Sequence, residues 1–126
     1  MQGNQKDILR LKHILDSISE IEKYTLNINF DEFSNNSMMI DASIRHLEII
    51  GEASNHLSEI IKLTYKTIEW RQIIGFRNLL IHEYFSVDVN LVWHVIQYDL
   101  PHFKQTIIEI IEDLTKNNEL FNTKYM

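Results

Sequence analysis

The stretch DILRLKHILDSISEIEKY, residues 7–24, decides the fold class because its apolar residues repeat with the period of an α-helix. The members of this stripe follow one another at spacings of three and four, with further apolar neighbours beside them: Ile8, Leu11, Leu15 and Ile18, then Leu9, Ile14 and Ile21. An amphipathic helix buries such a stripe against other helices. The stretch therefore predicts a helical protein with a core between its helices.

The sequence after this helix predicts a loop and then a second helix. Four asparagines within residues 27–36 interrupt the helical pattern and favour a loop with one short helical turn. Ser34 or Ser37 can cap the second helix, whose apolar stripe continues to Ile61. Gly51 lies on that stripe, where a glycine costs about 0.5–1 kcal/mol relative to alanine. We therefore expect another helix to approach closely at Gly51.

Two further helices are expected in the second half of the chain. The first spans residues 68–82, and Ser86 and Asp88 supply a start signal for the last one. Pro101 lies inside the last pattern, where it removes a backbone N–H and clashes with the preceding turn. Because the apolar stripe resumes after it, Pro101 predicts a kink over residues 97–100 and not a break.

The fold expected from these patterns is all-α. The last helix should end at Asn117 and Asn118, and no β-type alternation or internal repeat appears in the chain. Only three glycines and one proline are available to break the helices. The prediction is an antiparallel bundle of four to five helices, with residues 1–126 forming a single domain.

Composition excludes several kinds of site. The chain has no cysteine, so disulfides, thiolate nucleophiles and thiolate-bound zinc are ruled out. No apolar run reaches the roughly 18 residues of a membrane span, and the first residues are polar. We therefore expect a cytoplasmic protein without a membrane partner.

The net charge of −6 hides a basic segment. Between residues 62 and 82, Lys62, Lys66, Arg71 and Arg77 face a single acidic residue, a local charge of +3 that leaves −9 elsewhere. Such a segment suits an RNA phosphate backbone, and we predict RNA contacts at Lys62, Lys66 and Arg71. Taken alone, a solvated charged loop explains the segment equally well.

The stretch RNLLIHEY, residues 77–84, gathers four polar groups suited to phosphodiester chemistry and is called the motif below. Arg77 presents a fixed fork of donors that matches phosphate oxygens, and the His82 imidazole can exchange protons near neutrality. Singly, each residue has a plain structural explanation, such as a surface ion pair or a packing aromatic. Their joint occurrence in the basic segment favours catalysis by Arg77 and His82, with Asn78 and Tyr84 as weaker candidates. The role of Glu83 stays open.

Helix geometry sets a condition on the motif. On a regular helix Asn78 and His82 stand one turn apart on the same side, whereas Arg77 and His82 are offset by about 140°. Either the helix loosens before His82, or two copies of the chain face each other and complete one site. The homodimer is the preferred alternative, because it would also double the arginine charge where RNA must enter.

A metal site has little support. His82 and Glu83 begin like a zinc-protease helix, but that pattern needs a second histidine where Ser86 stands. None of the other histidines is paired with another at three or four residues. The sequence therefore predicts neither a metal nor another cofactor.

The spacing Arg-x4-His-x-Tyr, with asparagine directly after the arginine, resembles the signature of HEPN-domain proteins, and more narrowly of the HepT toxins. The surrounding sequence resembles that family in the same order, in five blocks: DASIRHLEIIGEAS at 41–54, WRQIIGFRN at 70–78, Val87-Asp88, Val92-Trp93 and Leu100-Pro101. The resemblance covers nearly the whole chain.

This resemblance implies a HEPN-like helical homodimer that acts as a metal-independent endoribonuclease toxin. It implies that Arg77 clamps the phosphate, that Asn78 orients the site and that His82 is the general acid or base. It further implies an antitoxin, a minimal nucleotidyltransferase of the MntA type, which transfers AMP to Tyr84. The alternative is a non-catalytic helical dimer that serves as a binding or scaffold partner of such a nucleotidyltransferase.

Overall fold

The computed structural model describes residues 2–83 and 86–125, and the side chains of residues 5–83 and 86–116. Within this part of the chain every regular element is helical, which confirms the all-α prediction. The four long helices are α1 (Gln2–Thr25), α3 (Ser37–Asn55), α5 (Trp70–His82) and α7 (Leu100–Tyr125). Shorter elements connect them: α2 (Phe30–Ser34), α4 (Glu59–Thr64), α6 (Val89–His94) and the π-helical segment η2 (Val95–Asp99).

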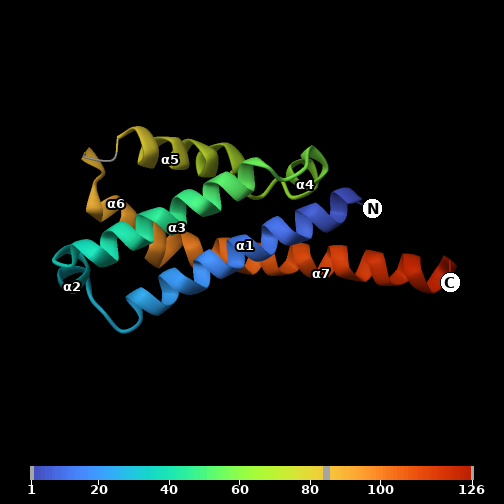
Figure 1. Ribbon diagram of the computed structural model, residues 1–126, viewed down its shortest axis with the longest axis horizontal. Helices are drawn as coiled ribbons and strands as arrows, with labels where there is room; N and C mark the ends of the chain where they lie inside the picture. The colour runs from blue at the N-terminus through green and yellow to red at the C-terminus, as the bar shows by residue number, and fades with distance from the viewer. Residues whose placement is uncertain (1, 84–85, 126) are drawn as a thin grey trace.

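The long helices lie side by side in the order α5, α3, α1, α7, with each neighbour running antiparallel to the last (Figure 1). Helix α3 packs against α1 on one side and α5 on the other, while α7 packs against α1. Helix α5, which holds most of the motif, therefore depends on α3 for its position.

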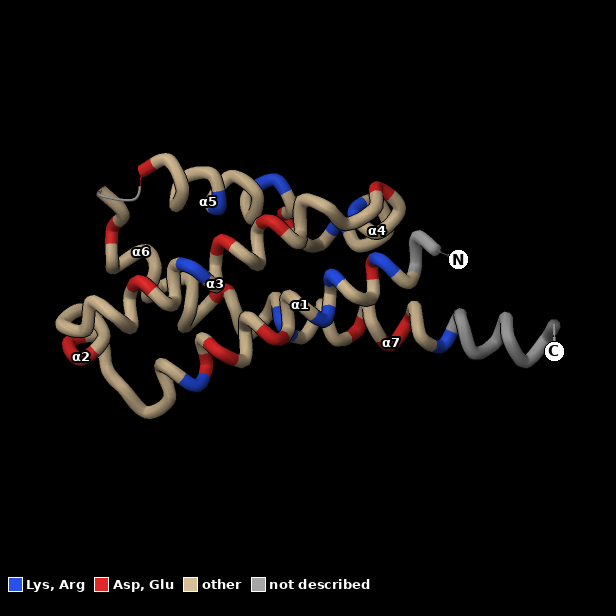
Figure 2. Tube along the Cα trace, in the orientation of Figure 1, with Lys and Arg blue, Asp and Glu red and all other residues tan. Residues whose placement is uncertain are grey.

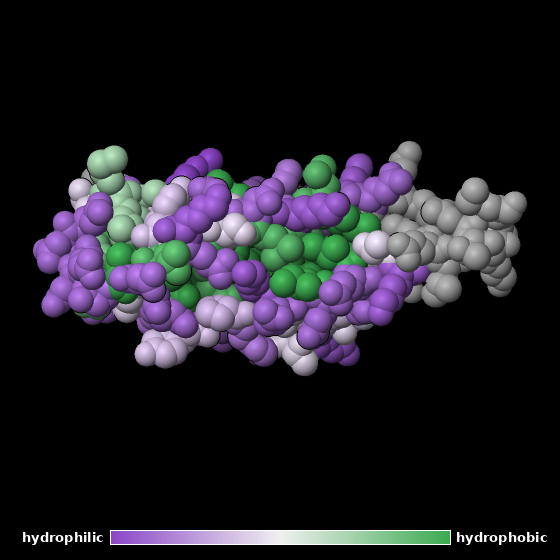
Figure 3. Space-filling view, turned by 90° about the horizontal axis from the view of Figure 1, so that it is seen from below, coloured by the Kyte–Doolittle hydropathy of each residue, from purple (hydrophilic) through white to green (hydrophobic). Residues whose placement is uncertain are grey.

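The core lies between these helices and confirms the apolar stripe of residues 7–24. Leu11, Ile14, Ile18 and Ile21 of α1 are no more than 1% exposed, whereas Leu9 is 56% exposed and lies outside the stripe. Helix α7 is covered mainly by α1, so apolar side chains at its margin remain partly exposed. Figure 3 shows them as an apolar strip between hydrophilic borders on the face seen from below.

The predicted loop contains the expected helical turn, α2, but the cap of the next helix was predicted wrongly. Helix α3 begins at Ser37 and is capped by Asn36, whose side-chain oxygen accepts a hydrogen bond from the Met39 N–H at 3.0 Å. Ser34 is not available as a cap, because its hydroxyl donates to the carbonyl of Asp31 within α2. An asparagine and a serine are equally good caps, so local sequence did not separate them.

The second helix ends earlier than predicted, at Asn55, and Ser58 caps the separate helix α4. The cause is a distant residue. The buried Asp7 carboxylate accepts hydrogen bonds from the Ser58 N–H at 3.0 Å and from its hydroxyl at 2.7 Å. Leu57 and Ile61 nevertheless stay buried, so the apolar stripe persists across a break in the backbone.

Pro101 has the predicted effect, and the last helix is longer than predicted. The π-helical segment η2 directly precedes the first turn of α7, which confirms a distortion before Pro101. Helix α7 then continues through Asn117 and Asn118 to Tyr125. Asparagine lowers helix propensity by less than ~1 kcal/mol, and no glycine or proline follows to end the helix. None of the described helices combines the length and apolarity needed to cross a membrane.

Candidate active site at the contact of α3 and α5

Helix α5 presents the motif as a regular helix up to His82. Glu83 is its C-cap, with its N–H donating to the Leu79 carbonyl at 2.9 Å. The helix therefore does not loosen before His82, and that alternative was wrong. Arg77 and His82 remain on different sides of α5, offset by about 140°.

Gly51 is where α3 and α5 touch, as predicted, and its neighbour is Arg77. A Cβ atom added at Gly51 would lie 2.8 Å from the Arg77 Cγ and 3.5 Å from its Cα. Any larger residue would push the two helices apart. The glycine thus fixes the position of the Arg77 stem against α3.

The Arg77 head is held by carboxylate and amide groups. Its Nη2 lies 2.6 Å from the Glu52 Oε2, and its Nη1 donates to the Asn78 Oδ1 at 3.0 Å. The other Glu52 oxygen lies 2.8 Å from the His56 Nε2. The Arg77 side chain is 30% exposed, and its buried Nε has no hydrogen-bond partner among the described residues. The guanidinium is therefore both fixed and within reach of a ligand.

Glu52 is the residue that sequence reasoning missed. A signal for it existed, because Glu52 directly follows the glycine that was expected to meet another helix. A carboxylate beside such a contact lies within reach of polar groups on the neighbouring helix. His56, four residues later, follows the spacing at which side chains meet on one helix face.

The structure brings only part of the predicted site together within one protomer. Arg77 and Asn78 join Glu52 at the contact of the two helices, whereas His82 is exposed on another side of α5. Tyr84 lies outside the described residues. The protomer alone therefore presents a guanidinium and an imidazole that point in different directions.

The three predicted RNA contacts lie near the other end of α5 (Figure 2). Lys62 donates to the Asn55 carbonyl at 3.0 Å, and its side chain is only 16% exposed, so it mainly stabilises the end of α3. Lys66 and Arg71 are exposed. Arg71 stands eleven residues before His82, about 16 Å along the helix.

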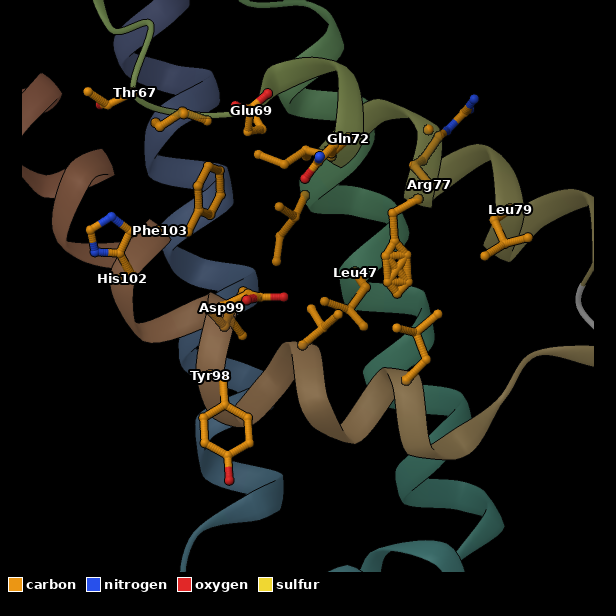
Figure 4. A pocket seen from close by; sticks show the side chains of 18 residues that line it. Leu47, Thr67, Glu69, Gln72, Arg77, Leu79, Tyr98, Asp99, His102 and Phe103 are labelled. Carbon is orange, nitrogen blue, oxygen red and sulfur yellow. The ribbon is translucent and has the colours of Figure 1, made fainter.

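An apolar cavity of about 880 Å³ lies between α5 and the segment formed by η2 and α7, with α3 as its floor. Its lining includes Phe76, Leu79 and Phe103, and Figure 4 shows the nitrogen atoms of Arg77 pointing away from it. Three apolar residues beside it are strongly exposed: Leu79 at 40%, Leu91 at 40% and Tyr98 at 70%. Exposed apolar surface of this kind marks an interaction site.

No three histidine, aspartate or glutamate side chains of the described residues come together as metal ligands. The polar groups at the contact are instead joined in one chain, from Asn78 through Arg77 and Glu52 to His56. Such a set can bind an anion through the guanidinium while its own carboxylate stays hydrogen-bonded.

Comparison with known proteins gives a consistent result. Residues 14–110 match the family model described as Ribonuclease HepT-like. A Methanocaldococcus jannaschii protein named "Gamma-glutamylcyclotransferase and putative RNase" is 41% identical over 122 residues, which cover 96% of this chain and 54% of that protein. This chain therefore spans about half the length of that relative.

Two shorter relatives are covered almost entirely. A second protein of Methanocaldococcus jannaschii, named "Putative RNase", is 38% identical over 97 residues, which are 77% of this chain and 89% of that protein. The "Probable ribonuclease HepT" of Thermococcus cleftensis is 38% identical over 104 residues, or 82% of this chain and 93% of that protein. No solved structure matches the chain.

Proposed function

Because this chain belongs to the HepT-like ribonuclease family, we propose that it is a metal-independent endoribonuclease that uses Arg77, Asn78 and His82. The observation that supports this most is the Arg77 guanidinium, which Gly51 and Glu52 hold in place while it stays partly exposed. A fixed fork of donors suits the charge that develops on a phosphate under attack.

In the proposed reaction, the His82 imidazole takes the proton of a ribose 2′-hydroxyl. The 2′-oxygen then attacks the adjacent phosphorus, and the bond to the 5′-oxygen of the next nucleotide breaks. The leaving oxygen takes up a proton, and a 2′,3′-cyclic phosphate remains. Arg77 stabilises the added negative charge, and Asn78 orients its Nη1.

Cleavage of RNA by the purified protein in excess EDTA tests this function. Cleavage that persists in the chelator supports it, and cleavage that requires added metal contradicts the mechanism. If the protein forms a complex with a nucleotidyltransferase and cleaves none of a varied set of RNAs, the scaffold function is favoured instead.

We propose that the active enzyme is a homodimer in which one protomer supplies Arg77 and the other supplies His82. A regular α5 keeps the two groups about 140° apart, so one protomer cannot direct both at one phosphate. The exposed Leu79, Leu91 and Tyr98 beside the apolar cavity provide a surface that a second copy can cover. It lies on the His82 side of α5, because Leu79 and His82 are about 60° apart around the helix.

Leu79→Glu is expected to weaken the dimer at least tenfold and to lower cleavage in proportion, because it buries a charge in an apolar interface. Light scattering across a range of protein concentrations measures the dissociation constant. Leu9→Glu is the matched control, since Leu9 is 56% exposed on α1 and does not line the cavity. Equal dissociation constants for both variants would remove Leu79 from the interface.

Glu52→Ala is expected to lower the single-turnover cleavage rate about 10–100-fold, because the guanidinium loses its anchor and small misplacements are costly. Glu52→Gln should fall between Glu52→Ala and the wild type, since its amide oxygen can still accept from Arg77. The unfolding free energy should change by no more than about 1 kcal/mol, as expected for an exposed ion pair. Glu112→Ala removes an exposed carboxylate of α7 and controls for the change in net charge. Equal cleavage rates in Glu52→Ala and Glu112→Ala would exclude a positioning role for Glu52.

We further propose that the protein is a toxin of the cytoplasm, controlled by a nucleotidyltransferase of the MntA type that adds AMP to Tyr84. This tyrosine is two positions after His82 in sequence, so a nucleotide there would bring bulk and negative charge to the RNA site. Intact-mass measurement with ATP and such an enzyme should show a gain of one or more AMP units that Tyr84→Phe abolishes. A gain that persists in Tyr84→Phe would assign the modification to another residue.

A further inference from the structure

A second cavity of about 330 Å³, lined mainly by polar residues and called the polar cavity, lies on the other side of Arg77, along α3 between α1 and α5. Arg77 borders both this cavity and the apolar one, and its nitrogen atoms point away from the apolar side (Figure 4). The guanidinium head, the part that would contact a phosphate, therefore belongs to the polar cavity. We call this cavity the arginine groove and define it by Arg10, His13, Arg45, His56 and Arg77.

The arginine groove follows one stripe of α3. Arg45, Glu48, Glu52 and His56 line it at spacings of three and four residues, which places them on one face of the helix. From Arg45 to His56 this face extends about 16 Å. A helical nucleic-acid strand advances only ~3.4 Å per nucleotide, so the groove has room for more than one phosphate.

The charges in the groove are arranged to leave arginine donors free. Both carboxylates are already engaged, Glu52 with Arg77 at 2.6 Å and Glu48 with Arg45 at 3.4 Å. A guanidinium has five N–H donors on three nitrogens. Arg45 uses one nitrogen on Glu48, and Arg77 uses two, Nη2 on Glu52 and Nη1 on Asn78. Three arginines against two carboxylates give the groove a positive balance on a chain of net charge −6.

A structural role explains the position of Arg10, but not of every basic side chain that lines the arginine groove. Arg10 donates from Nη1 to the His56 carbonyl at 2.8 Å and so stabilises the end of α3. Arg45 has no comparable role, because its side chain is 70% exposed and its contact with Glu48 is a surface pair worth about 0–1 kcal/mol. His13 faces the same groove from α1, three residues after Arg10, and adds an imidazole donor.

We propose that the arginine groove binds the sugar–phosphate backbone of the RNA strand beside the bond that is cleaved. This inference rests on the proposed ribonuclease function and gives the strand a path along α3, in addition to the predicted contacts at Lys66 and Arg71 near the start of α5. Contacts of arginine and imidazole with phosphates fix the strand without reading its bases. The groove therefore contributes affinity for any RNA sequence.

The test uses the full chain and a labelled single-stranded RNA that carries 2′-O-methyl groups. These groups replace the 2′-hydroxyls, so the RNA can bind but the proposed attack on phosphorus cannot occur. Arg45→Glu should weaken binding by about tenfold at ~0.1 M salt. In the double variant Arg10→Gln/Arg45→Ala, the plot of log affinity against log salt concentration should become less steep by about 1.4. Each lost phosphate contact on a single strand reduces the magnitude of this slope by about 0.7. Lys12→Ala/Lys23→Ala removes the same charge from exposed positions of α1 outside the groove and should keep nearly the full slope.

Fluorescence anisotropy gives the affinities, and thermal unfolding shows that each variant is folded. The double variant loses the Arg10 hydrogen bond that caps the end of α3. Arg45→Glu leaves that cap intact, so its RNA affinity still tests the groove if the double variant unfolds. If the wild type cleaves unmodified RNA but the groove variants bind RNA like the lysine control, the groove is not an RNA-binding site and the ribonuclease function stands. A wild type that neither binds nor cleaves RNA overturns the ribonuclease function as well.

Discussion

His82→Ala is expected to slow RNA cleavage by about 10²–10⁴-fold, the usual contribution of a positioned general acid or base. Arg77→Ala should cost about 10²–10³-fold, because it removes the donors that stabilise charge on the phosphate. Single-turnover rates with saturating enzyme separate this loss from any loss of RNA affinity. His46→Ala changes a histidine of α3 that lines neither cavity and contacts Tyr24 and Ser17 of α1, so it serves as the matched control and should keep the wild-type rate.

Mixing the two inactive variants tests whether the site is shared between protomers. A dimer of one Arg77→Ala chain and one His82→Ala chain has one site with both groups intact and one with neither. If the chains exchange freely, half of the dimers are of this kind, so the mixture should recover about a quarter of the wild-type rate. No recovery after verified exchange would contradict a site divided between protomers. Wild-type rates in both single variants would end the assignment of the motif as catalytic.

Local sequence was sufficient to predict those structural features that depend on residues within a few positions of one another. The stripe of residues 7–24 became the buried face of α1, and the missing N–H of Pro101 has its counterpart in the π-helical turn before α7. Gly51 also belongs here, since a glycine on an apolar stripe already indicates that a neighbour is close. The identity of that neighbour, Arg77, required the fold.

Features that depend on distant residues were predicted wrongly or missed. The break between α3 and α4 depends on Asp7, which is 51 residues away from Ser58 in sequence. The RNA contact at Lys62 stays a prediction, and the sequence did not show that this side chain also donates to the Asn55 carbonyl. Glu52 was overlooked for the same reason, since its importance follows from the packing of α3 on α5.

Gly51→Ala is expected to destabilise the protein by about 1–3 kcal/mol, the usual cost of overpacking a tight contact. Alanine favours a helix over glycine by about 1 kcal/mol, which acts in the opposite direction. The clash should prevail, because the new Cβ would lie 2.8 Å from the Arg77 Cγ and 3.5 Å from its Cα. These atoms are close to the backbone, so only a shift of α5 away from α3 can relieve the contact.

Gly75→Ala is the matched control on the same pair of helices. A Cβ there meets nothing within 4 Å in the protomer, so the substitution should stabilise α5 by about 0.5–1 kcal/mol. Urea unfolding at a fixed protein concentration compares the two variants. If Gly51→Ala also stabilised the protein, the contact between α3 and α5 would be looser than described.

Gly51→Ala should also lower the cleavage rate about 10–100-fold in the protein that remains folded, because a shift of α5 moves the Arg77 head away from Glu52. A purely structural role of Gly51 would reduce the folded fraction and leave the rate per folded molecule unchanged. Combining Gly51→Ala with Arg77→Gly tests the clash itself, since glycine at position 77 removes the side-chain atoms that a Cβ at position 51 would meet. In that background Gly51→Ala should cost less stability, and the difference measures the coupling between the helix contact and the arginine.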